Sequence, residues 1–183
     1  MKRGYASTPE GQIHFYTHGR GEPLLLLHEA PRAARSFAPL MRLLGGRFRC
    51  FAADTLGFGM SDPLPAKARM EDLARSMVHL LDAQKIGRAH VLGFHTGNKI
   101  AAAMAANDPD RIGRVVLLGM THSLVVSRKD RDAAIMAIVK KYMANHRESP
   151  DGSHLLRAWA SDYAGLAGVW WNPAVVQAKA LRF

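Results

Sequence analysis

One histidine stands at the centre of a segment whose spacing suits catalysis. The segment reads Gly93-Phe94-His95-Thr96-Gly97, with a glycine two residues before the histidine and another two residues after it. An imidazole can act as a nucleophile, a general base or a ligand. Glycines at these positions let a strand and a helix approach closely around a tight turn, whose central residue takes a strained backbone conformation. Histidine tolerates a positive φ better than most residues. We therefore expect His95 on such a turn.

The elements that must position this turn follow from the apolar pattern. Short, uninterrupted apolar runs predict strands covered on both faces, over residues 24–27, 48–53, 89–93 and 115–118, with a weaker alternating strand over 13–16. Helical spacing predicts a helix over 70–83, an alanine-rich helix over 96–107, and a helix ending at Gly45-Gly46 that Ser36 would cap. Alternation of strands and helices favours a mostly parallel sheet with helices on both faces.

Two further segments complete a recognisable set. His28-Glu29-Ala30-Pro31 follows the first leucine-rich strand, and residues 54–62 (DTLGFGMSD) follow the next strand. With the turn at His95, they resemble the α/β-hydrolase superfamily, in its group of esterases, epoxide hydrolases and haloalkane dehalogenases. The resemblance covers residues 11–120 and extends to a subgroup whose elbow reads Gly-x-His-Thr-Gly and whose oxyanion loop ends in Pro-Arg, as it does here at Pro31-Arg32. It implies an α/β-hydrolase fold truncated after a helical lid, with the core in residues 1–121 and an incomplete lid in 122–183.

The resemblance also implies roles for individual residues. His95 stands at the nucleophile position of the elbow, and the backbone N–H groups of Thr96 and Ala30 would form the oxyanion hole that stabilises developing negative charge. The substrate would be a small apolar, ester-like molecule, and no cofactor is implied. The side chains expected to contact the substrate are His28, Glu29, Phe94, His122 and Trp159. The tryptophans of residues 159–171 could equally form the packing core of the lid.

The sequence departs from the family where the chemistry would occur. Related hydrolases carry Ser, Asp or Cys at the position of His95 and usually Gly at the position of Glu29, and Asn98 replaces a residue that is usually small. In the family, the catalytic acid follows the strand after the lid and the catalytic histidine follows the last strand, positions that this sequence does not reach before Phe183. Asp54 is not a substitute for the acid, because its loop usually has a structural role. We therefore expect this chain alone to lack a triad and to be inactive. The alternative is a non-catalytic pseudoenzyme or small-molecule binding module on the same fold.

Three histidines raise a second alternative for the site. His28, His95 and His122 each follow the carboxyl end of a predicted strand, where ligands of open α/β sheets bind, so together they could hold zinc. In the interpretation that we prefer, His28 is hydrogen-bonded within its own loop and His122 lies at the hinge of the lid. It assigns no metal site.

The composition of the chain indicates which classes of binding partner to expect. Lys and Arg number 25 against 15 Asp and Glu, giving a net charge of +10, but the basic residues are scattered and form no nucleic-acid-binding motif. Residues 1–10 lack the apolar core of a signal peptide, and the leucine run of 24–27 is too short to cross a membrane. The single cysteine, Cys50, is expected to be a buried thiol in a reducing compartment. These features predict a cytoplasmic protein without nucleic-acid or membrane partners, which could self-associate through an exposed sheet edge at 115–118.

Overall fold

The computed structural model describes residues 1–30, 32–64, 68–119 and 136–137. The chain folds into strands and helices that alternate after an initial hairpin. In chain order they are β1 (Lys2–Thr8), β2 (Gly11–His18), β3 (Glu22–Leu27), the 3₁₀ turn η1 (Ala34–Phe37), α1 (Ala38–Leu44), β4 (Phe48–Ala53), α2 (Met70–Ala83), β5 (Ala89–Phe94), α3 (Gly97–Asn107), the 3₁₀ turn η2 (Pro109–Arg111) and β6 (Ile112–Leu118).

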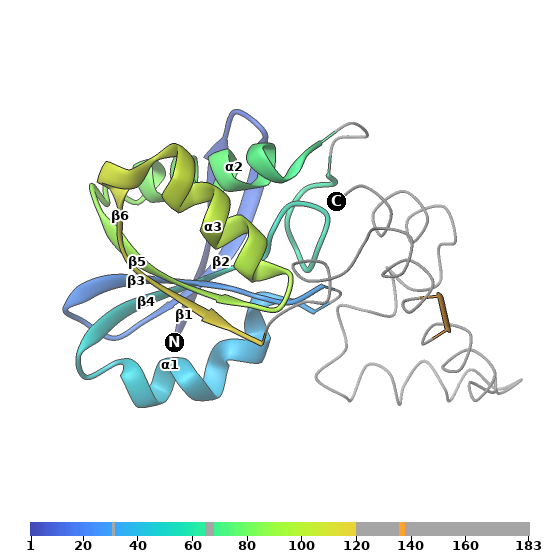
Figure 1. Ribbon diagram of the computed structural model, residues 1–183. Helices are drawn as coiled ribbons and strands as arrows, with labels where there is room; N and C mark the ends of the chain where they lie inside the picture. Colours follow the sequence, from blue (N-terminus) through green and yellow to red (C-terminus); the bar gives the residue numbers. More distant parts are fainter. Residues whose placement is uncertain (31, 65–67, 120–135, 138–183) are drawn as a thin grey trace, which may run out of the picture.

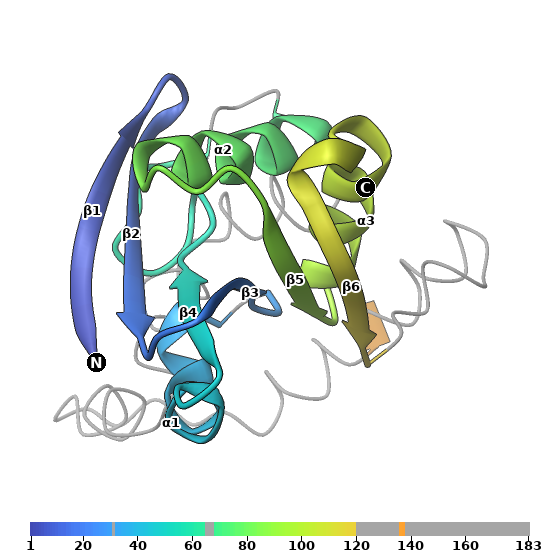
Figure 2. The same ribbon diagram turned by 90° about the vertical axis from the view of Figure 1, so that its left-hand side faces the viewer.

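These strands form one sheet in the order β1-β2-β4-β3-β5-β6. β4, β3, β5 and β6 pair in parallel, whereas β1 and β2 form an antiparallel hairpin whose second strand pairs antiparallel with β4. Helix α1 covers one face of the sheet, and α2 with α3 cover the other (Figures 1 and 2). The predicted fold, a mostly parallel sheet with helices on both faces, is confirmed.

The uninterrupted leucine run of β3 is explained by this layering. Successive side chains of a strand point to opposite faces. Leu25 and Leu27 therefore belong to the core beneath α2 and α3, whereas Leu24 and Leu26 belong to the core beneath α1. Each face buries its own apolar layer, and Cys50 of β4 is buried in the α1 layer as expected.

The predicted boundaries of β4 and α2 match the structure, and those of β3, β5, β6 and α3 differ by one to three residues. The cap predicted at Ser36 is wrong. Ser36 lies inside η1 and its hydroxyl donates to the Ala33 carbonyl, whereas α1 starts later and has no side-chain cap. Pro39 in the first turn of α1 has no N–H to satisfy, which lessens the need for a cap.

Strand β6 is the edge of the described sheet. Its last residues, Val116, Leu117 and Leu118, are 45–52% exposed, although the sequence pattern alone suggested a buried strand. This is the apolar edge expected at 115–118. The predicted lid, residues 122–183, lies almost entirely outside the described residues, so its assignment stays a prediction.

Candidate functional site

The turn at His95 has the geometry that its glycines predict. β5 ends at Phe94 and α3 begins at Gly97, and between them His95 has a φ of +54° and an exposed side chain. A Cβ on Gly97 would collide with the Leu27 carbonyl of β3, and one on Gly93 would lie 2.6 Å from the carbonyl oxygen of Gly97. Strand and helix can meet this closely only because both positions lack a side chain.

Strand β6 holds the turn from the other side. The His95 N–H donates to the Leu118 carbonyl at 2.9 Å. Asn98, which is buried, donates its side-chain amide to the carbonyls of Leu118 and Gly119 and accepts from the Leu118 N–H. The departure from a small residue at Asn98 thus has a structural role, because its amide joins the first turn of α3 to the end of β6.

The loop after β3 approaches the same turn. The Ala30 N–H donates to the Thr96 hydroxyl over 2.5 Å, across 66 residues of sequence. One of the two backbone donors expected in the oxyanion hole is therefore bonded to a side chain of the elbow. The Thr96 oxygen stands in this structure where a substrate oxygen would accept that bond.

His28 is bonded within its surroundings at both ring nitrogens. Its Nδ1 donates to the Glu29 carbonyl at 2.9 Å, and its Nε2 accepts the Thr55 N–H at 3.1 Å. Burial lowers the pKa of His28 below its usual 6.5, so the ring is neutral at physiological pH. With both nitrogens engaged, His28 has no lone pair to offer a metal. Within the described parts of the chain, no group of three His, Cys, Asp or Glu residues is placed to hold a metal ion.

Glu29 is held against its own loop. Its Oε1 lies 3.0 Å from the Arg32 Nε, and its Oε2 is buried without a hydrogen-bond partner. Its backbone carbonyl accepts from both His28 and the Arg32 N–H. The carboxylate that replaces the usual glycine is therefore fixed in place, one residue before the Ala30 donor.

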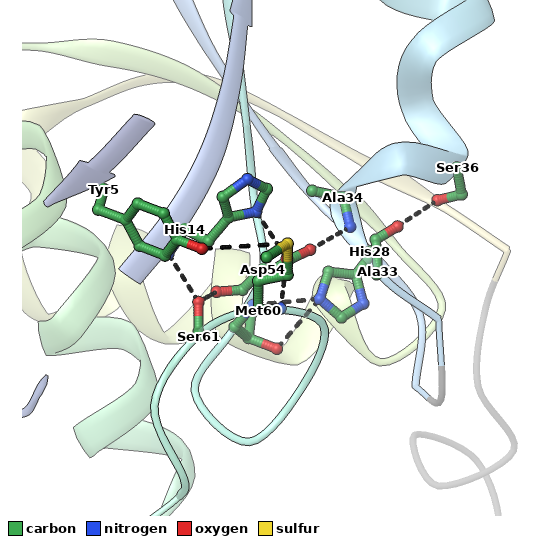
Figure 3. Close-up of polar contacts among 10 residues, drawn as sticks. Tyr5, His14, His28, Ala33, Ala34, Ser36, Asp54, Met60 and Ser61 are labelled. Carbon is green, nitrogen blue, oxygen red and sulfur yellow. Dashed lines mark hydrogen bonds and ion pairs between the residues drawn. The ribbon is translucent and has the colours of Figure 1, made fainter. Parts of the chain in front are cut away.

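Asp54 organises the loops at this edge of the sheet (Figure 3). Its Oδ2 accepts from His14 Nδ1 at 2.8 Å and from the Met60 N–H at 3.0 Å, and its Oδ1 accepts from the Ala34 N–H at 2.6 Å. The Ser61 hydroxyl donates to the Asp54 carbonyl at 2.7 Å. A carboxylate that is buried and bonded in this way is structural, in agreement with the role expected of this loop.

The side chain of His95 has few neighbours among the described residues. Its ring meets the ring of Phe94 edge-on at 6.3 Å between centroids, and no described carboxylate or second imidazole is bonded to it. Phe94 itself is half-buried against the core beneath α1. His122 and Trp159 lie outside the described residues, so their expected roles are not placed. The described residues assemble no catalytic triad.

Comparison with known proteins identifies the family. The sequence model of the alpha/beta hydrolase fold family matches residues 22–170. The chain belongs to the α/β-hydrolase fold family. It is 35% identical over 116 residues to a 2-hydroxy-6-oxononadienedioate/2-hydroxy-6-oxononatrienedioate hydrolase of Paraburkholderia xenovorans, covering 60% of this chain and 40% of that protein. It is 34% identical over 108 residues to haloalkane dehalogenase 2 of Mycobacterium tuberculosis, covering 58% and 38%.

Solved structures agree with this assignment. The N-acyl homoserine lactonase AidH superposes with a TM-score of 0.63 at 27% identity, covering 71% of this chain and 48% of that one. The epoxide hydrolase CorEH has the same TM-score at 25% identity, covering 65% and 42%. The chain spans about 40% of the length of the curated relatives it matches. No described helix of this α/β-hydrolase chain is long and apolar enough to span a bilayer.

Three features of the site were not predicted from the sequence. They are the Thr96 hydroxyl on the Ala30 donor, the amide bridge of Asn98, and the pairing of His14 with Asp54. Only Asn98 left a signal, because it is a polar residue in the first turn of an otherwise alanine-rich helix. The other two depend on loops that the fold brings together.

Proposed function

We propose that this α/β-hydrolase chain belongs to an enzyme that hydrolyses small apolar, ester-like substrates, with His95 at the nucleophile position. The observation that carries the proposal is the exposed His95 side chain at φ +54° on the strand-to-helix turn, where the next residue, Thr96, accepts a hydrogen bond from the Ala30 N–H. Matched relatives are hydrolases and dehalogenases by name, which supports a small-molecule substrate. The expected contacts to that substrate are His28, Glu29, Phe94, His122 and Trp159.

The chemistry would proceed through the imidazole. An unprotonated ring nitrogen of His95 attacks the ester carbonyl, and the carbonyl oxygen becomes an oxyanion. Collapse of this intermediate breaks the ester C–O bond and expels the alkoxide or phenolate, and the other ring nitrogen of His95 loses its proton to solvent or to the leaving group. Water then cleaves the acyl-imidazole, releasing the acid and restoring His95. The Thr96 and Ala30 N–H groups would stabilise the oxyanion. Because Thr96 occupies the Ala30 donor, its hydroxyl must rotate away before a substrate oxygen can take that place.

The competing proposal is a binding module without turnover. Two observations favour it: no described carboxylate orients the His95 ring, and the Ala30 donor is already satisfied by Thr96. An imidazole without an orienting partner reacts more slowly than one held by a third group. We therefore expect this chain alone to show no sustained turnover, in line with its missing triad, and we test for a single acylation event instead.

The test uses the 183-residue chain in excess over p-nitrophenyl butyrate and follows release of nitrophenolate. We expect release to be roughly 10²-fold slower in His95→Ala and His95→Ser than in the unmodified chain. His79→Ala is the matched control, since His79 is a partly exposed imidazole of α2 bonded to Glu10, away from the elbow. Equal rates for the unmodified chain and both His95 variants would contradict the enzymatic proposal. Retained ligand binding in that case would favour the binding module.

Self-association and location are further proposals about this chain. Three consecutive exposed apolar residues end β6, and an edge strand of this kind is a template for pairing with another chain. We propose that copies of this chain associate through β6.

A cytoplasmic location is supported by Cys50, which is buried and unpaired. The division into a core of residues 1–121 and a lid of 122–183 also remains a proposal.

A further inference from the structure

A carboxylate with one unsatisfied oxygen lies one residue before the Ala30 donor. The Glu29 side chain is 14% exposed, and Oε1 is paired with Arg32 at 3.0 Å. Oε2 is buried and accepts no hydrogen bond. A buried acceptor without a donor has lost its hydrogen bonds to water without forming new ones, so it destabilises the fold unless another group donates to it. A ligand can supply that donor.

The loop keeps Oε2 from turning out to water. The Glu29 carbonyl accepts from His28 Nδ1 at 2.9 Å and from the Arg32 N–H at 2.8 Å, which fixes the backbone on both sides of the residue. The ion pair with Arg32 fixes the side chain. Groups held by their surroundings in this way bind a ligand without a large entropy cost.

We propose that Glu29 is a specificity-determining residue, whose Oε2 accepts a hydrogen bond from a donor group of the substrate. This proposal rests on the proposed function, which places the substrate carbonyl at the Ala30 N–H. The loop then offers a donor at Ala30 and an acceptor at Glu29 in adjacent residues. Such a pair fits an acyl group with a hydroxyl, ammonium or amide N–H close to its carbonyl. An acyl chain that carries only hydrocarbon leaves Oε2 unsatisfied.

Binding of three unreactive anilides to the 183-residue chain tests the proposal by calorimetry. They differ at the third acyl carbon, where 3-hydroxybutyranilide offers a donor, 3-oxobutyranilide offers only an acceptor and butyranilide offers neither. The anilide N–H lies on the other side of the carbonyl from the acyl chain and is common to all three, so it does not affect their order. We expect the hydroxy compound to bind about tenfold more tightly than butyranilide, the smaller end of what a hydrogen bond to a charged group contributes.

The variant Glu29→Gln makes the test sharper. Its amide oxygen must face the Arg32 Nε, so the amide nitrogen takes the place of Oε2 and donates instead of accepting. We expect the preference to reverse, with 3-oxobutyranilide binding more tightly than 3-hydroxybutyranilide. Glu22→Gln is the control, because Glu22 is an exposed glutamate at the start of β3, and it should leave the order unchanged. Circular dichroism verifies that each variant is folded.

The outcomes separate the two proposals. Binding of all three anilides without preference, or an unchanged order in Glu29→Gln, overturns the role of Glu29 and leaves the proposed function standing. Failure of the unmodified chain to bind any of the three overturns the small-molecule site and the role of Glu29 together. A preference for the hydroxy compound that reverses in Glu29→Gln supports both.

Discussion

Replacing Asp54 with alanine should be among the most destabilising substitutions in the described part of the chain. The Asp54 carboxylate is buried and accepts hydrogen bonds from His14 Nδ1, the Ala34 N–H and the Met60 N–H. Alanine leaves two buried donors, on His14 and Ala34, and the part-buried Met60 N–H without an acceptor. Leaving a buried donor without its acceptor costs about 1–3 kcal/mol. We therefore expect Asp54→Ala to lower the free energy of unfolding by about 4 kcal/mol, a large share of the roughly 5–15 kcal/mol of a typical domain.

A graded series tests the reasoning. Asp54→Asn keeps the shape and one acceptor oxygen but presents an amide NH₂ to the remaining donors, so we expect a loss of about 2 kcal/mol. Asp62→Ala is the control within the same loop. The Asp62 Oδ2 accepts the Gln12 N–H at 2.8 Å, but at an exposed site, so removal should cost about 0.5 kcal/mol. Urea unfolding followed by far-UV circular dichroism measures all three variants.

Two results would count against this account. If Asp54→Ala and Asp62→Ala lowered stability equally, burial of the network would not be the source of its energy. If Asp54→Asn were as stable as the unmodified chain, the carboxylate would be dispensable. Hydrogen exchange provides a local measurement. The amides of Ala34 and Met60 should exchange faster in Asp54→Asn, whereas the Gln12 amide should respond only to Asp62→Ala.

Three other predictions follow from separate contacts. Gly97→Ala should lower stability by about 3 kcal/mol in thermal unfolding, because its Cβ meets the β3 backbone, whereas Gly87→Ala, with no atom within 4 Å of its Cβ, should change little. Burial lowers the pKa of His28 in the folded chain, so the unfolded chain binds an extra proton as the pH drops below about 6.5, and the free energy of unfolding should decrease as the pH is lowered. Urea titrations of His28→Gln should show a smaller pH dependence, and an unchanged pH dependence refutes the prediction. Val116→Lys on the β6 edge should shift sedimentation profiles toward monomer, and monomer in the unmodified chain would refute self-association.

The parts of the fold that the sequence predicted well are those governed by local pattern. The strands β3 and β4 are short apolar runs with both faces buried, and α2 places its apolar side chains at helical spacing beneath one face of the sheet. Gly93 and Gly97 identified the elbow because their requirement is steric and local to it. Such signals need only residues that are near each other in sequence.

Other features depend on pairing between distant segments. β1 was missed because Lys2–Thr8 is mostly exposed and polar, and it is a strand only because its backbone pairs with β2. The hydrogen bond of His14 with Asp54 joins residues that are 40 positions apart. The cap at Ser36 was predicted wrongly for a related reason, since its hydroxyl found the Ala33 carbonyl in a local 3₁₀ turn instead.

The hydrogen bond between Ala30 and Thr96 shows why sequence motifs alone do not predict which backbone donors of the site are free. The sequence motifs gave two backbone donors around an imidazole, and either donor would serve an oxyanion. Only the fold shows that a hydroxyl reaches one of them across 66 residues. A substrate oxygen must therefore compete with an intramolecular acceptor.

A developing oxyanion competes for the Ala30 N–H better than a neutral carbonyl does, because hydrogen bonds to charged acceptors are about twice as strong. This difference favours the transition state over the bound substrate. A Thr96→Val variant, which frees the Ala30 N–H, should therefore bind neutral anilides more tightly than the unmodified chain does.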